Sequence, residues 1–308
     1  MSAPRILLGP QRTMPILGDA VAALGVKGKL AAVTAGWEER EDEDRELAQH
    51  LGGRTVSLRL FDRAEDVFQK DPAVLQAMSE HHSRLHGLRD VYRKHLGHAL
   101  EAARELTHST ADSRLIEAEL DEAISNVQHI DSRHVARVAA VHQDFDARMQ
   151  LAAHPAVAKH VAEVAAILDD CDAVCIAGGH VAVLYNRLAM FGVLDHVADK
   201  PIFAWSAGAM VLSERIVLFH DSPPQGAGNP EVLGPGLGMV RGVVPLPHAA
   251  SRLNLEDPGR VALFARRFAP DICAALEPGS KLLQDGEAWS GEATRRLAPT
   301  GSLEEIAA

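Results

Sequence analysis

The 308-residue sequence has little cysteine, no long apolar run and no excess of positive charge. Its cysteines, Cys171, Cys175 and Cys273, are odd in number and form no C-x-x-C pair of the metal-binding type. This usage argues against a disulfide framework and suits a reducing compartment. No window approaches the ~18–20 apolar residues of a membrane span, and the first residues lack the apolar core and cleavage site of a signal peptide. We therefore expect a cytoplasmic protein.

Acidic residues outnumber basic ones, and the formal net charge is −11 at pH 7. That balance argues against a nucleic-acid-binding surface. With 47% hydrophobic and 24% charged residues, the composition is ordinary for a globular protein. We expect neither nucleic acid nor membrane among the partners.

Short apolar runs alternate with helical patterns in the first 68 residues and again after residue 154. Such alternation is typical of a parallel sheet with helices on both faces. We therefore predict an α/β fold, a three-layer αβα sandwich with a mostly parallel central sheet. The strands are expected near residues 5–8, 29–34, 54–60, 172–177, 201–205, 241–247, 273–276, 281–283 and 288–289. The Pro- and Gly-rich segment 221–238 is predicted to be irregular.

The stretch from Asp71 to Ala153 contains no strand pattern. Apolar residues recur three or four apart, with an interruption around residues 130–134, and predict two helices of roughly 35 residues, each on the order of 50 Å long. Asp71-Pro72 is a start signal for the first helix, and Asp112 or Ser113 is one for the second. We predict one α/β domain over residues 1–308, with core segments 1–68 and 154–308 and a helical-hairpin insertion at 69–153.

A long hairpin that projects from the core would leave its apolar stripes in water, and such surfaces usually contact another chain. We therefore expect a homodimer or a larger even homo-oligomer through the hairpin, which could also cover the site as a lid. The alternative is a monomer whose hairpin lies flat on the core. The hairpin is rich in histidine, but we favour helix histidines without a ligand role over a metal site, and expect no metal or cofactor. These histidines are His81, His82, His86, His95, His98, His108, His129, His134 and His142.

The sequence PIFAWSAGAM at residues 201–210 carries the strongest chemical signal. An apolar strand runs into Ser206, small residues follow, and a helical pattern begins. This is the layout of a nucleophile elbow, in which a strained serine sits between a strand and a helix N-terminus. Ala204 stands where the G-x-S-x-G pattern has its first glycine, and an ordinary serine N-cap is the alternative.

A nucleophilic serine needs a base within hydrogen-bond reach and an acid that orients the base. His248 follows a short predicted strand, and Asp221 begins the irregular segment after the elbow helix. We predict His248 as the base and Asp221 as the acid. His220 is the rival base, and Glu214 and Glu231 are reserve acids.

The residues Gly178-Gly179, Trp205-Ser206-Ala207-Gly208-Ala209, Gly236-Leu237-Gly238 and His248 resemble the serine peptidase family of peptidase E and cyanophycinase, peptidase family S51. The resemblance implies a class I glutamine-amidotransferase-like, flavodoxin-like fold and a hydrolase that cleaves a peptide, isopeptide or amide bond. It makes Ser206 the nucleophile and His248 the general base. It gives the oxyanion hole to the backbone N–H groups of Gly179 and Ala207, and it places Gly178, His180 and Trp205 at the substrate.

Two features depart from that family. His180 stands where the family usually has Asn or Asp after the Gly-Gly pair, and the hairpin is not part of the family core. Arg187, Arg215 and Arg252 are candidate readers of an acidic substrate group. A non-catalytic binding or scaffold protein on the same fold, and an acyl- or amido-transfer enzyme with the same site, remain as alternatives.

Overall fold

The computed structural model describes residues 3–107, 109, 112–221, 228–286 and 288–307. In this part of the chain, the largest sheet has seven strands in the order β11-β10-β1-β5-β4-β2-β3. The strands β1, β5, β4, β2 and β3 run parallel to one another. Strand β10 pairs antiparallel with β1, and β11 pairs antiparallel with β10. Their bounds are β1 Arg5–Leu8, β2 Leu30–Val33, β3 Thr55–Ser57, β4 Ala173–Ile176, β5 Ile202–Trp205, β10 Lys281–Asp285 and β11 Ala288–Glu292. The predicted α/β class and mostly parallel sheet are confirmed.

Helices cover both faces of this sheet because successive strand residues alternate between two apolar clusters. On one face, Leu8, Phe203 and Trp205 pack with residues of α1 and α2. On the other face, Leu7 and Ala204 pack with the remaining core helices. The helices of the core are α1 Leu17–Ala23, α2 Arg45–His50, α3 Leu60–Lys70, α6 Pro155–Asp169, α7 Val181–Met190, α8 Ala207–Leu212, α9 Ala249–Arg252 and α10 Pro258–Phe268, with 3₁₀ turns at η1 Ala35–Arg40, η2 Leu151–Ala153 and η3 Val193–His196.

The last third of the chain builds two smaller sheets in the described residues. One has the order β13-β12-β9-β8, and the other pairs β6 with β7. The prediction that 221–238 is wholly irregular is wrong, because β7 lies within it; residues 222–227 of that segment are outside the described residues. The strands are β6 Arg215–Leu218, β7 Glu231–Pro235, β8 Val243–Pro247, β9 Ile272–Leu276, β12 Arg295–Leu297 and β13 Leu303–Glu305.

The insertion forms the two long helices that the sequence predicts, α4 Pro72–Thr107 and α5 Ser113–Met149. Asp71 accepts hydrogen bonds from the first N–H groups of α4. The side chain of Asp112 caps α5 in the same way, as predicted. His154 Nδ1 lies 2.8 Å from Asp71 Oδ2, so the two ends of the insertion meet.

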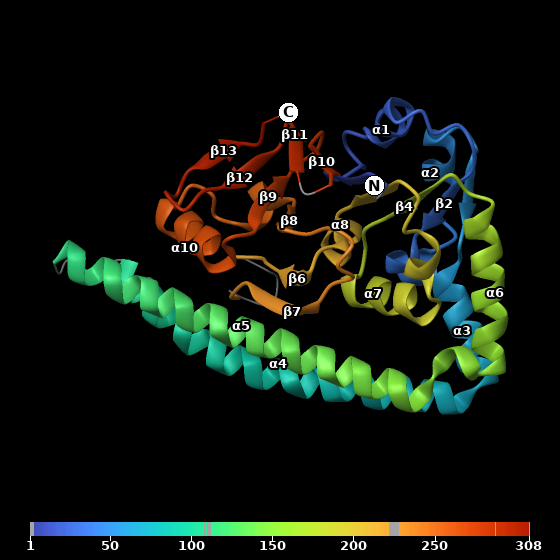
Figure 1. Ribbon diagram of the computed structural model, residues 1–308, viewed down its shortest axis with the longest axis horizontal. Coiled ribbons are helices and arrows are strands. Elements are labelled where there is room, and N and C mark those ends of the chain that lie inside the picture. Colours follow the sequence, from blue (N-terminus) through green and yellow to red (C-terminus); the bar gives the residue numbers. More distant parts are fainter. Residues whose placement is uncertain (1–2, 108, 110–111, 222–227, 287, 308) are drawn as a thin grey trace.

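The hairpin lies along the body of the protein (Figure 1). Helix α5 packs against β7 and α10, and α4 packs against α3. Gly234 of β7 lets α5 approach closely, because a Cβ at that position would lie 2.7 Å from Val138 Cγ1. The apolar stripe of the hairpin is thus covered in large part by its own chain.

Helix α5 is continuous through residues 130–134, where the apolar pattern is interrupted. The polar residues there are buried in a network rather than placed in a break. Asp131 accepts hydrogen bonds from Tyr92 Oη at 2.7 Å and from Arg267 Nε at 2.7 Å, and the ring of His134 stacks on Tyr92. This network joins the hairpin to α10 of the body.

Among the described residues, no single helix is both long enough and apolar enough to cross a membrane. One bent pair of segments meets both criteria when the two are taken together: the first combines α5 and η2, the second is α6, and the angle between them is 81°.

Candidate active site

Ser206 follows β5 directly and has a backbone conformation of φ 52° and ψ −125°. Positive φ is unfavourable for a residue with a Cβ and is found where the surrounding structure enforces it, often at active sites. Here the buried strand β5 and the buried helix α8 hold the turn on both sides. The strand, strained serine and helix have the geometry that the elbow pattern predicts.

The glycines after β4 pack against this turn. A Cβ on Gly178 would lie 2.6 Å from Ser206 Cβ, so only glycine fits there. Gly179 has φ 113°, and a Cβ on it would lie 2.1 Å from the carbonyl oxygen of Gly36, which follows β2. Because β2, β4 and β5 are neighbours in the parallel sheet, their carboxyl ends form one edge, where sites of α/β folds usually lie.

The backbone N–H groups of Gly179 and Ala207 have no acceptor among the described residues. Gly179 follows Gly178, which packs against Ser206, and the N–H of Ala207 is at the N-terminus of α8. Free N–H groups at such a position can stabilise a developing negative charge. These are the two donors that the resemblance assigns to an oxyanion hole.

The two other predicted substrate contacts have different surroundings. His180 is exposed, and its Nδ1 accepts a hydrogen bond of 3.2 Å from the N–H of Val183, so it caps α7. Its ring remains accessible at the edge of the sheet. Trp205 is 7% exposed and packs in the apolar cluster with α1, which leaves little of the indole for contact with a substrate.

His248 follows β8 and is half-buried. Its backbone is left-handed, with φ 60° and ψ 35°, and its N–H donates to the carbonyl of Leu276. Helix α8, which follows Ser206, packs on β8, which precedes His248. Burial lowers the pKa of His248, Arg252 lowers it further, and Glu277 raises it. No hydrogen bond joins Ser206 to His248 in the described structure.

Glu277 is an acidic neighbour of His248 that the sequence pattern does not single out. Strands β8 and β9 are parallel, with Pro247 opposite Leu276, so His248 and Glu277 occupy equivalent positions after their strands. The Glu277 carboxylate accepts a hydrogen bond of 2.7 Å from the N–H of Ala250, in the helix that His248 begins. Glu277 follows a predicted strand just as His248 does, and this shared position is the signal that could have identified it.

Asp221, the predicted acid, has other partners. Its carboxylate binds Arg260 through two hydrogen bonds, one of them 2.7 Å long, and accepts a hydrogen bond of 2.7 Å from the N–H of Asn254. Within the described part of the chain, none of these contacts joins Asp221 to His248. The reserve acids are also engaged: Glu231 pairs with Arg89 of α4, and Glu214 accepts from the N–H of Gly242.

The three arginines considered as substrate readers differ in their environment. Arg215 pairs with Asp271, and Arg187 is buried over the rings of Phe61 and Phe68. Arg252 forms no ion pair with a carboxylate among the described residues, and it acts electrostatically on His248. Of the three, Arg252 alone is both unpaired in this part of the chain and close to the predicted base.

The hairpin histidines form no metal-binding group in the described structure, where no cluster of three or more His, Cys, Asp or Glu side chains could hold an ion. All three cysteines are buried and free, and burial raises the pKa of Cys175 and of Cys273 to about 12. Those two thiols stay protonated near neutral pH, which fits small apolar packing residues.

Two solved structures align with this chain. The crystal structure of a peptidase from an acI-B1 Actinobacterium aligns with a TM-score of 0.50 and 13% identity, covering 100% of this chain and 95% of that one. A candidate peptidase E from Listeria monocytogenes aligns with a TM-score of 0.44 and 11% identity, covering 95% and 98% of the two chains. At 13% identity, the alignment with the Actinobacterium peptidase shows similarity of fold and nothing more. No curated protein matches the sequence.

The profile of peptidase family S51 matches residues 125–289. The matched segment takes in α5 from residue 125 onward, the Gly178-Gly179 turn, the Ser206 elbow, His248 and Glu277. It spans more than half of the chain, and the chain accordingly belongs to peptidase family S51.

Proposed function

We propose that this protein is a serine peptidase of the peptidase E and cyanophycinase type, which cleaves a peptide, isopeptide or amide bond through an acyl-enzyme. The observation that carries the proposal is the backbone of Ser206, strained at φ 52° between a buried strand and a helix N-terminus. Strain of this kind is kept where a side chain must be presented in one orientation. The proposed fold type is the flavodoxin-like sandwich of the class I glutamine amidotransferases.

In the proposed reaction, Ser206 Oγ attacks the scissile carbonyl carbon while His248 accepts its proton. The N–H groups of Gly179 and Ala207 donate to the oxygen that becomes negative. His248 then gives the proton to the leaving amine as the C–N bond breaks, and water hydrolyses the acyl-enzyme by the same route. Because donors to an oxyanion act mainly in the transition state, each is worth on the order of 3 kcal/mol of the barrier.

For the orienting acid we propose Glu277, with Asp221 as the alternative. Support comes from the electrostatic effect of Glu277 on His248 and from the register of β8 and β9. Asp221 is engaged by Arg260. For the substrate, we propose a small peptide or amide, and Arg252 is the residue best situated to contact an acidic group near His248.

The test is labelling by a fluorophosphonate probe, which forms a covalent bond with an activated serine. Ser206→Ala should abolish labelling and keep the far-UV circular dichroism and melting temperature of the wild type. Ser83→Ala, which changes an exposed serine of α4, is the matched control and should label normally. Labelling of Ser206→Ala at the wild-type rate would overturn the proposal.

The acid is tested in the same assay. Glu277→Gln should slow labelling more than Asp221→Asn does, because only the first change removes the carboxylate that acts on His248. The reverse order would restore Asp221 as the acid. Equal, small effects of both changes would exclude a charged orienting group at either position.

A further inference from the structure

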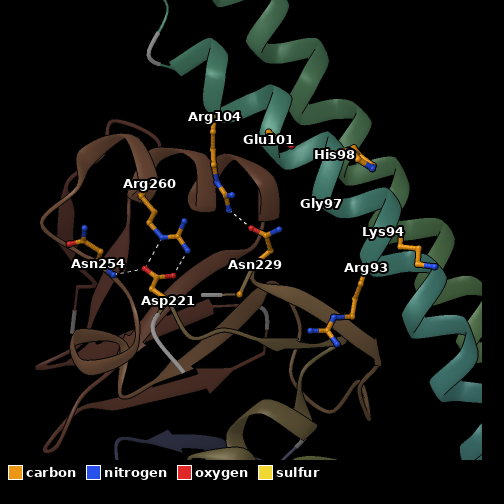
Figure 2. A pocket seen from close by; sticks show the side chains of 11 residues that line it. Arg93, Lys94, Gly97, His98, Glu101, Arg104, Asp221, Asn229, Asn254 and Arg260 are labelled. Atoms are coloured by element: carbon orange, nitrogen blue, oxygen red, sulfur yellow. Dashed lines mark hydrogen bonds and ion pairs between the residues drawn. The ribbon is translucent and has the colours of Figure 1, made fainter. Parts of the chain in front are cut away.

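A cavity of about 830 Å³ lies between helix α4 of the hairpin and the body of the protein. Figure 2 shows its two walls, with Arg93, Lys94 and Arg104 on α4 and Asp221 and Arg260 on the body. Its size falls in the range of small-molecule sites. Apart from Asp221, none of the residues assigned to the candidate active site is among its described lining residues.

The charges around the cavity are unbalanced. The described lining residues include four arginine and lysine side chains but two carboxylates, although the whole chain carries a net charge of −11. Arg260 already takes the carboxylate of Asp221 through two hydrogen bonds. The second carboxylate, Glu101, is exposed on α4.

Of the three cations that α4 contributes, Arg93 lies 3.3 Å from the carboxylate of Glu231, whereas the other two form no ion pair in the described part of the chain. The guanidinium of Arg104 donates to the side-chain oxygen of Asn229, and its buried Nε has no hydrogen-bond partner there. Lys94 is exposed and forms no ion pair with a described residue. Gly97 lies between them on α4, and a Cβ there would have no atom within 4 Å, so the helix surface is open at this point.

Like charges are also held close together here. The pKa of Arg104 is lowered first by burial and then by the nearby guanidinium of Arg260, whereas the more weakly acting carboxylates of Asp221 and Glu101 raise it. Repulsion between two partly buried cations is unfavourable, and an anion between them would replace it by attraction. Arginine is well suited to that task because its planar N–H donors match the oxygens of phosphate and carboxylate groups.

We propose that this cavity binds a small molecule with at least two oxyanion groups, held by Arg104 and Lys94 of α4 and by the amide side chains of Asn229 and Asn254 on the body. The ligand bridges the hairpin and the body, since its donors come from both. Phosphate and carboxylate groups share the recognised chemistry, and the experiment separates them.

The experiment is isothermal titration calorimetry at low ionic strength with two probes, inorganic tripolyphosphate and citrate. The wild-type protein should bind at least one of them. The double variant Lys94→Gln/Arg104→Gln should bind it at least about tenfold more weakly, because two charge-assisted contacts are lost. Arg148→Gln, an exposed arginine change elsewhere on the hairpin, is the matched control and should bind as the wild type does.

The outcomes separate the possibilities. Tighter binding of tripolyphosphate identifies a phosphate ligand, and tighter binding of citrate identifies a polycarboxylate. Absence of binding of both probes at ~10 mM, or equal binding by the double variant and the wild type, overturns the proposal. Should the double variant fail to fold, Lys94→Gln alone serves, because this exposed side chain supports no described contact, and a several-fold loss is then expected. Ser206→Ala should bind the probe like the wild type, so that this result stands apart from the proposed catalysis.

Discussion

His248 has a cation and an anion as neighbours, and the two act on its pKa in opposite directions. A histidine base works in its neutral form, so activity rises as pH passes its pKa. Burial and Arg252 lower that pKa, so the acid limb of the pH profile should lie below the ordinary histidine value of ~6.5. The second-order rate constant of fluorophosphonate labelling, measured against pH, gives this limb without knowledge of the substrate.

Arg252→Gln should move the limb to higher pH, because it removes a charge that disfavours the imidazolium. Glu277→Gln should move it to lower pH, because it removes a charge that favours the imidazolium. Interactions between partly exposed charges are worth roughly 0.2–1 kcal/mol, so each shift should be several tenths of a pH unit. Shifts of the same sign in both variants would show that these residues do not set the pKa of His248.

Gly178 is a second residue at which the structure predicts a clear effect of substitution. A Cβ at this position would lie 2.6 Å from Ser206 Cβ, so Gly178→Ala should displace the elbow. We expect loss of labelling and destabilisation by about 1–3 kcal/mol, the usual range for overpacking. Gly87→Ala, in α4 with no atom near the added Cβ, should instead stabilise the protein by roughly 0.5–1 kcal/mol. Chemical denaturation measures both, and normal labelling of Gly178→Ala would contradict the assigned geometry.

The difference between Ser206 and Glu277 shows which candidate site residues a sequence can reveal. The elbow at Ser206 is a local pattern, because the strand, the serine and the small residues are consecutive. The proximity of Glu277 to His248 depends on the parallel pairing of β8 with β9, which joins segments far apart in the chain. Asp221 has the expected position after the elbow helix, but its pairing with Arg260 is equally non-local.

At the scale of elements, helix α5 shows why an apolar pattern can fail inside a real helix. Asp131 and His134 interrupt the periodicity but are buried, since Asp131 is 2% exposed and pairs with Arg267, itself 2% exposed. A sequence pattern treats such residues as solvent-facing. Likewise, β7 lies in a segment rich in Pro and Gly, a composition that does not predict a strand. Its Gly234 allows the close approach of α5.

The Asp131–Arg267 pair should anchor the hairpin to the body. Asp131→Ala leaves the Arg267 guanidinium buried without its carboxylate, which typically destabilises a protein by about 3–5 kcal/mol. The control is Asp144→Ala, a change on α5 like Asp131→Ala. It removes an exposed carboxylate that pairs with Arg84 of α4 and should destabilise the protein by at most about 1 kcal/mol. Urea unfolding followed by tryptophan fluorescence compares the two. Equal effects would mean that the buried pair does not hold the hairpin.

At the scale of the whole molecule, a homodimer through the hairpin remains a prediction. Its premise is a hairpin that projects into solvent, whereas α5 packs on β7 and α10. The large apolar side chains that stay exposed on the hairpin, Leu75, Val91 and Leu115, would then have to contribute to the interface. Light scattering at micromolar concentration gives the mass, and the mass of a single chain would contradict the dimer.

The same packing predicts the effect of removing the hairpin. Asp71 and His154, near the two ends of the insertion, are in contact, so a Gly-Ser linker in place of residues 69–150 has only a short gap to span. The deletion would uncover the body face that Tyr92, Leu96 and Val127 now cover within the main apolar cluster. We therefore expect a melting temperature lower by at least ~5 °C, since a few kcal/mol shift a domain of this size by that order, and increased binding of a hydrophobic dye. A deletion variant that melts with the full-length protein and binds no more dye would show that the hairpin contributes little to the core, and its labelling at Ser206 would then show directly whether the catalytic site needs the hairpin.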